Sequence, residues 1–248
     1  MTPFAIRSPV LGAPHGFFTR LGGVSVGPYA SLNCAMSGAD DPAHVAENRD
    51  RVRRALGGAA LLGCTQVHGV SVETVVSPWM PGHGPRADGM VTAIPGLVLG
   101  VITADCAPVL LHDAAAGVVG AVHAGWRGAV AGVLDAVVAA MLALGATQDG
   151  ISAAVGPCIR QVSYEVGEDM RDAVLAAGDA AQFLVPGRRA GHWQFDLAGY
   201  CATRLAGVGR VDVVDADTCA DEARFFSHRR RTLAGGGVIG HQISAIVV

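Results

Sequence analysis

The middle of the sequence constrains the fold most, because apolar residues follow one another there with little polar interruption. The segment LVLGVITA (97–104) is continuously apolar, whereas a strand with one solvent-facing side alternates between apolar and polar residues. We therefore expect a strand buried on both faces. PVLLHD (108–113) and GVVGAVHA (117–124) predict two further strands, joined by a turn at residues 113–117.

Helices and strands alternate along much of the rest of the chain. The patterns predict helices at 43–57, 129–145 and 167–178, the first capped by Asp40 or Asp41 and ended by Gly57. Further segments predict strands at 71–76, 151–157, 210–216 and 237–248, and a strand that becomes a helix capped by Asp196 at 193–209. Because some strands form hairpin-like pairs, we expect a mixed sheet in a layered α/β fold. No GxGxxG follows a first strand, so no dinucleotide cofactor is indicated.

The composition fits one well-buried domain and excludes several classes of partner. Hydrophobic residues make up 51% of the chain and charged residues 16%, which indicates a globular protein. The Gly/Pro-rich loop at 77–89 is too short to divide domains, so residues 1–248 are expected to form a single domain. A net charge of −3 predicts no binding to nucleic acid or anionic membrane.

The same sequence indicates a cytoplasmic protein with reduced cysteines. The N-terminus lacks the pattern of a signal peptide, and the most apolar window is interrupted by Asp105 and Pro108. The six cysteines form no CxxC motif, so we expect neither a disulfide framework nor a zinc ribbon. Any metal site must combine residues from distant segments.

Three side chains capable of binding a metal follow apolar runs: His68 in CTQVHGV, Cys106 in TADCAPVLL and His123 in AVHAGWRG. Open α/β folds place functional groups at strand ends. One thiolate and two imidazoles suit zinc, and three protein ligands leave a fourth position open, as catalytic zinc sites do. Asp105 and Gln66 are expected to orient a metal-binding side chain or a water molecule through hydrogen bonds, without binding the metal themselves.

Other interpretations of these residues remain open. An isolated histidine is often hydrogen-bonded in a core, and an isolated cysteine often acts as a small apolar side chain. Cys106 with His123 as its base also fits a cysteine hydrolase that needs no metal.

Anion-binding candidates are the arginines Arg49, Arg127 and Arg229, since a planar guanidinium suits phosphate or carboxylate. Neighbouring arginines at 51, 53 and 54 fit the solvated face of a helix better. The tract SHRRR (227–231) also fits a solvated loop.

Several segments together resemble one family. Eleven short motifs occur in the order expected of the laccase-like polyphenol oxidoreductases, whose members are also described as purine nucleoside phosphorylases. These motifs are HGFFTRLGGVS, SLN, ENR, QVHG, ADGMVT, TADCAPVLL, HAGWRG, GPCI, YEVG, FDL and FFSHRR. The resemblance extends from about residue 14 to residue 240.

The resemblance implies a single-domain fold of α/β/β/α-like layers and a metal site at His68, Cys106 and His123. It implies zinc there, with copper as the alternative. The activities it implies are phosphorolysis of adenosine, inosine and S-methyl-5′-thioadenosine, and hydrolytic deamination of adenosine. Candidate substrate-binding residues in the matching motifs are Asn33, Arg49, Arg127, Glu165, His228 and Arg229, with Glu165 considered for proton transfer.

The expected partners are therefore purine nucleosides and inorganic phosphate. Polyphenol oxidation ranks below nucleoside chemistry, because a multicopper oxidase needs many imidazoles, commonly in His-x-His pairs, and the nine histidines here form none. The remaining alternatives are the cysteine hydrolase, a copper oxidoreductase and a binding module without catalysis.

Overall fold

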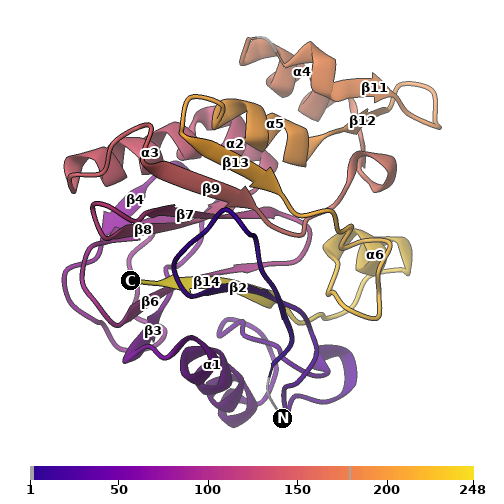
Figure 1. Ribbon diagram of the computed structural model, residues 1–248. Coiled ribbons are helices and arrows are strands. Elements are labelled where there is room, and N and C mark those ends of the chain that lie inside the picture. The colour runs from indigo at the N-terminus through magenta and orange to yellow at the C-terminus, as the bar shows by residue number, and fades with distance from the viewer. Residues whose placement is uncertain (1–2, 179) are drawn as a thin grey trace.

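Two mixed β-sheets pack against each other at the centre of the protein (Figure 1). The computed structural model describes residues 3–178 and 180–248. The five-stranded sheet has the order β1 (Ala5–Ile6), β2 (His15–Phe18), β14 (Gln242–Val247), β6 (Leu97–Thr103) and β3 (Ala60–Leu62). The six-stranded sheet has the order β13 (Arg210–Val213), β9 (Ile151–Val155), β7 (Ala107–Asp113), β8 (Val118–Ala124), β5 (Gly89–Thr92) and β4 (Val72–Thr74).

Helices cover the outer faces of both sheets. Helix α1 (Pro42–Leu56) packs on the five-stranded sheet, and α3 (Val133–Ala143) and α5 (Leu197–Arg204) pack on the six-stranded sheet. The layers therefore run α/β/β/α, which confirms the predicted fold class. None of the helices in the described part of the chain has the length and apolar character needed to cross a bilayer.

A smaller unit lies beside these layers (Figure 1). It contains α4 (Glu168–Ala176) and a three-stranded sheet in the order β10 (Glu165–Val166), β12 (Trp193–Phe195) and β11 (Leu184–Pro186). Helix α6 (His228–Leu233) precedes the final strand β14.

Strand β6 shows why the middle of the sequence is so apolar. Val98 belongs to the core cluster shared with α1, whereas Leu99 and Val101 belong to the cluster between the two sheets. Since both faces of the strand contact other layers, neither face needs polar residues.

Helix α1 begins and ends as the sequence predicts. The Asp41 carboxylate accepts a hydrogen bond from the Ala43 N–H at 2.8 Å, and Pro42 occupies the first turn. Gly57 ends the helix with φ +74°, a left-handed conformation that glycine adopts at low cost.

The single helix predicted at 129–145 is wrong. The chain forms α2 (Trp126–Ala131) and then α3, with a break at Gly132 (φ +102°). The Gly132 N–H bonds to the carbonyls of Gly128 and Ala129, which closes α2. The apolar period continues across the break, so the periodicity alone did not reveal it.

Candidate active site

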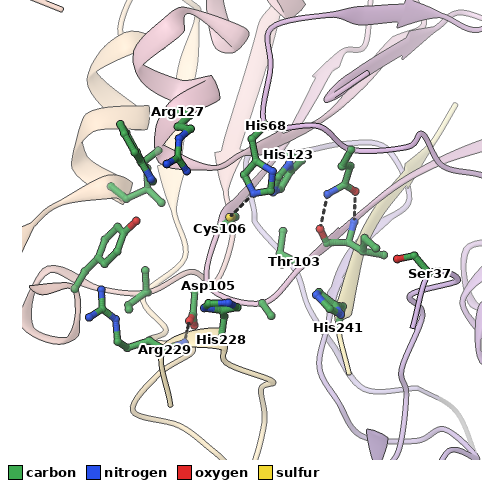
Figure 2. A pocket seen from close by; sticks show the side chains of 17 residues that line it. Ser37, His68, Thr103, Asp105, Cys106, His123, Arg127, His228, Arg229 and His241 are labelled. Atoms are coloured by element: carbon green, nitrogen blue, oxygen red, sulfur yellow. Dashed lines mark hydrogen bonds between the residues drawn. The ribbon is translucent and has the colours of Figure 1, made fainter. Parts of the chain in front are cut away.

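His68, Cys106 and His123 lie together, although they are far apart in the sequence. Their ligand atoms all lie within 4.8 Å of one another. The Cys106 sulfur is 3.9 Å from His68 Nε2, and the two imidazole rings are nearly perpendicular, with centroids 4.7 Å apart (Figure 2). We call these three residues the triad.

The β7–β8 hairpin positions two members of the triad. Cys106 immediately precedes β7, and His123 lies in β8 opposite Pro108. This antiparallel register brings the cysteine close to the histidine despite a sequence separation of 17 positions. The prediction of two paired strands here thus explains part of the site.

The carboxylate of Asp88 positions both histidines. It contacts His123 Nδ1 at 2.8 Å, which leaves Nε2 of that ring for a metal. It also accepts hydrogen bonds from the backbone N–H groups of His68 at 3.0 Å and Gly69 at 2.7 Å. The loop that carries His68, where the chain adopts φ +59°, is therefore held against β8.

Two glycines allow the chain to pass close to the triad. A Cβ on Gly125 would come within 2.7 Å of His68 Cδ2 and 3.2 Å of the Cys106 sulfur. A Cβ on Gly128 would come within 2.8 Å of the Gly69 carbonyl oxygen. Glycine is required in HAGWRG because the turn into α2 packs directly against the ligand-bearing loop.

The electrostatics of the triad favour a thiolate. Burial raises the pKa of the Cys106 thiol, but hydrogen bonds to His123 and His68 outweigh burial and bring it to about 7. Burial lowers the pKa of His123, whereas hydrogen bonds to Asp88 and Cys106 raise it, with a net result of about 9. Thiolate is the form in which cysteine binds metals or attacks electrophiles.

The triad opens into a cavity of about 570 Å³. Two arginines line it beside the triad: Arg127, which stacks on Trp126, and Arg229, which lies 5.5 Å from the centre of the Tyr164 ring. Among the described residues, neither arginine forms a salt bridge. Their positive charges are therefore available to an anion.

Asp105 holds helix α6 next to the triad. Its carboxylate accepts hydrogen bonds from Thr218 Oγ1 at 2.7 Å, Ser227 Oγ at 2.9 Å and the Arg229 N–H at 2.6 Å. Asp105 has φ +90°, a conformation that is rare for residues other than glycine. Asp105 thus holds Arg229 at the wall of the cavity. Gln66, the other residue expected to orient a ligand, instead forms two hydrogen bonds between its side-chain amide and the backbone of Ile102.

The structure brings some of the predicted substrate-binding residues to the cavity and leaves others outside. Arg127, His228 and Arg229 line it, whereas Asn33, Arg49 and Glu165 do not. Asn33 donates to Asp40 and accepts from the N–H of His241.

Arg49 lies in a separate pocket and donates to the Cys34 carbonyl, while the Glu165 carboxylate pairs with Arg189. The Glu165 carboxylate is therefore not placed to transfer a proton in this cavity. The backbone carbonyl of Glu165 accepts a hydrogen bond from the Arg229 guanidinium.

Sequence reasoning missed Asp88, Thr103 and His241. Asp88 precedes a short strand that was not predicted, β5, whose pairing with β8 places it beside His123. Thr103 and His241 become neighbours of the triad through the pairing of β6 with β14. The type and spacing of these residues carry no signal in the sequence. Only a prediction of the strand register would have placed them near the triad.

The triad fits a metal ion such as zinc. It offers one sulfur and two imidazole nitrogens at mutual distances suited to a shared ion, and Asp88 orients one imidazole in the way carboxylates orient metal-binding histidines. Within residues 3–178 and 180–248, no other set of three histidine, cysteine or acidic side chains is similarly close.

Comparisons with known proteins support one family. Residues 14–248 match the model of the family described as multi-copper polyphenol oxidoreductase laccase. A Deinococcus radiodurans protein named purine nucleoside phosphorylase is 47% identical over 91% of this chain and 87% of its own length. A Streptomyces griseus protein, purine nucleoside phosphorylase ORF3, is 44% identical over 92% of this chain and 94% of its own length.

Solved structures agree with the fold. A Neisseria meningitidis protein, NMB0706, has a TM-score of 0.87 at 32% identity, covering 100% of this chain and 99% of its own. YlmD from Geobacillus stearothermophilus has a TM-score of 0.87 at 29% identity, covering 97% of this chain and 93% of its own.

Proposed function

Since the chain belongs to the multi-copper polyphenol oxidoreductase laccase family, with relatives named purine nucleoside phosphorylase, we propose that it is a zinc-dependent purine nucleoside enzyme. Its reactions would be phosphorolysis of adenosine, inosine and S-methyl-5′-thioadenosine, and hydrolytic deamination of adenosine to inosine. The observation that carries the proposal is that two arginines, whose guanidinium groups form no salt bridge with any described residue, line the cavity that contains the triad.

The triad residues His68, Cys106 and His123 would hold the metal. A zinc ion there supplies a Lewis acid that polarises a substrate group or a water molecule. Asp88 would keep the His123 imidazole in the tautomer with Nε2 free for the ion.

Arg127 and Arg229 would bind inorganic phosphate during phosphorolysis. In that reaction a phosphate oxygen forms a bond to the anomeric carbon, and the bond from this carbon to the purine nitrogen breaks. The purine leaves with the bonding electron pair and takes up a proton. Two guanidinium groups suit this step because they fix a dianion beside the ribose and hold it in line for attack.

Deamination of adenosine would use the same cavity without phosphate. Water replaces the 6-amino group, and ammonia leaves after taking up a proton. The triad supports this branch because zinc deaminases likewise hold their metal with histidine and cysteine ligands.

Copper remains the alternative metal, since a Cys-His-His set also binds copper. Laccase chemistry reduces dioxygen by four electrons and uses a cluster of copper ions. The part of the chain that the structure describes assembles one group of three metal-binding side chains. We therefore place nucleoside chemistry above polyphenol oxidation.

The test is to incubate metal-free and zinc-loaded protein with adenosine, with and without phosphate, and to separate adenine, inosine and hypoxanthine. Adenine formed only with phosphate supports phosphorolysis, and inosine supports deamination. His68→Ala should remove both the zinc and the activity. Activity that survives complete chelation would overturn the zinc requirement and leave a metal-free role for Cys106 and His123 open.

A further inference from the structure

The cavity has two chemically different ends. Arg127 and Arg229 lie near Tyr164 at one end, where burial raises the pKa of the tyrosine hydroxyl and the two positive charges oppose that rise. In the view of Figure 2, His241, Thr103 and Ser37 lie on the other side of the triad. One end is therefore cationic, while the other carries hydroxyl and imidazole groups.

Two buried polar atoms at this second end have no hydrogen-bond partner among the described residues. They are Thr103 Oγ1 and His241 Nδ1, and both residues line the cavity. The pairing of β6 with β14 places Thr103 opposite Gln242, next to His241. Burying a polar atom without a partner destabilises the protein, because the atom loses its hydrogen bonds to water and gains none. Two such atoms in one cavity indicate a ligand that satisfies both.

The imidazole at this end carries no positive charge that would attract phosphate. Burial is the main cause that lowers the pKa of His241 to about 4, and the nearby His228, His123 and Arg231 lower it further. At neutral pH the ring is uncharged and offers one N–H donor and one nitrogen acceptor. A neutral heterocycle with both donors and acceptors complements such a pair.

The geometry of phosphorolysis then orients the nucleoside. Phosphate attacks the anomeric carbon on the side opposite the departing base, so the phosphate and the purine lie on opposite sides of the ribose. With phosphate at Arg127 and Arg229, the purine must point to the far end of the cavity.

We propose that Thr103 and His241 bind the polar edge of the purine base, so that the nucleoside lies across the triad. This assignment rests on the proposed function. Thr103 and His241 would be specificity-determining residues that recognise the base, and the sugar and phosphate would be bound elsewhere in the cavity.

The test couples side-chain changes to substrate changes. Thr103→Val and His241→Phe keep the volume and remove the hydrogen-bonding atoms. Each variant is assayed by phosphorolysis of inosine, 7-deazainosine and purine riboside, which alter the base, and of 2′-deoxyinosine and 5′-deoxyinosine, which alter the sugar. Zinc content and the KM for phosphate are measured in parallel.

We expect each variant to lose about tenfold in kcat/KM for inosine, as when one partner of a buried hydrogen bond is removed. The variants should then lose little more when the matching base atom is also removed, whereas changes to the sugar should remain fully additive. Zinc content and the KM for phosphate should stay at the wild-type level.

His44→Phe is the matched control. His44 also has a buried Nδ1 that finds no partner in the part of the chain the structure describes, but it lies on α1 outside this cavity. Its kcat/KM values should equal those of the wild type. Coupling of Thr103→Val and His241→Phe to the sugar analogues, or unchanged kcat/KM for inosine, overturns the assignment while leaving the proposed function intact. Wild-type protein that cleaves none of the nucleosides overturns both.

Discussion

Asp88 links the two histidines of the triad through one carboxylate. It contacts the His123 ring and the backbone of the loop that carries His68. Its pKa lies below the ordinary value, because hydrogen bonds from His123 and the Gly69 N–H outweigh the effect of burial. Asp88 is therefore ionised at neutral pH, and it would act on metal binding through His123 and the loop that carries His68.

Asp88→Asn should weaken zinc binding about 10- to 100-fold, the usual effect of losing a carboxylate behind a metal-binding histidine. Competition with a chromophoric chelator measures the zinc Kd. Asp113→Asn is the control, since Asp113 is also buried and accepts backbone N–H bonds, but from Ala115, Ala116 and Thr147, away from the triad. An equal loss of affinity in both variants would contradict a specific role for Asp88.

Arg127→Met keeps most of the side-chain length and removes the charge. Because a hydrogen bond to a charged group contributes about 1.5–3 kcal/mol, we expect the KM for phosphate to rise about 10- to 100-fold. Initial rates at saturating inosine and varied phosphate measure it. Arg204→Met, which removes an exposed arginine paired with Asp135, should leave this KM unchanged. An unchanged KM in Arg127→Met would count against a phosphate site here.

The turn from β8 into α2 brings the backbone against the ligand-bearing loop. Gly125→Ala adds a methyl group 2.7 Å from His68 Cδ2 and 3.2 Å from the Cys106 sulfur, so the triad must shift from its present arrangement. We expect the variant to fold but to bind less than half of the wild-type zinc, as measured by atomic absorption on purified protein. Gly167→Ala, with nothing within 4 Å of its added Cβ, should bind as much zinc as the wild type.

Elements with local signals are predictable from the sequence, and those defined by tertiary contacts are not. Helix α1 carries its own cap at Asp41 and its own end at Gly57, and strand β6 shows its burial directly. The break at Gly132 interrupts no apolar period, and β5 is only four residues long.

The same distinction holds for the site. His68, Cys106 and His123 were identified as metal-binding candidates partly because a family pattern contains them, and the structure brings the three together. Asp88 contacts His123 only because β5 pairs with β8. The spacing of residues in the sequence does not indicate that pairing.

At the scale of the whole molecule, stability should depend on pH through His241. Its folded pKa of about 4 lies below the ordinary 6.5, so its contribution is complete above pH 6.5 and is lost as the pH falls toward 4. Between pH 7.5 and 5.0, metal-free wild-type protein should lose about 1 kcal/mol more of its unfolding free energy than His241→Phe, after allowance for partial exposure. Urea unfolding at both pH values measures the difference, and equal losses in the two proteins would contradict it.

The three ligands of the triad are not held equally firmly. His123 lies in a hairpin at the centre of the six-stranded sheet and Cys106 immediately precedes its first strand, whereas His68 lies on a loop held by hydrogen bonds to Asp88. Because hydrogen bonds to Asp88 hold this loop, and His68 belongs to none of the described strands, a bound ion would leave through a state in which His68 has detached and two ligands remain. The residence time of a bound metal would then be set by opening of this loop, and metal exchange would be faster than unfolding of the sheets.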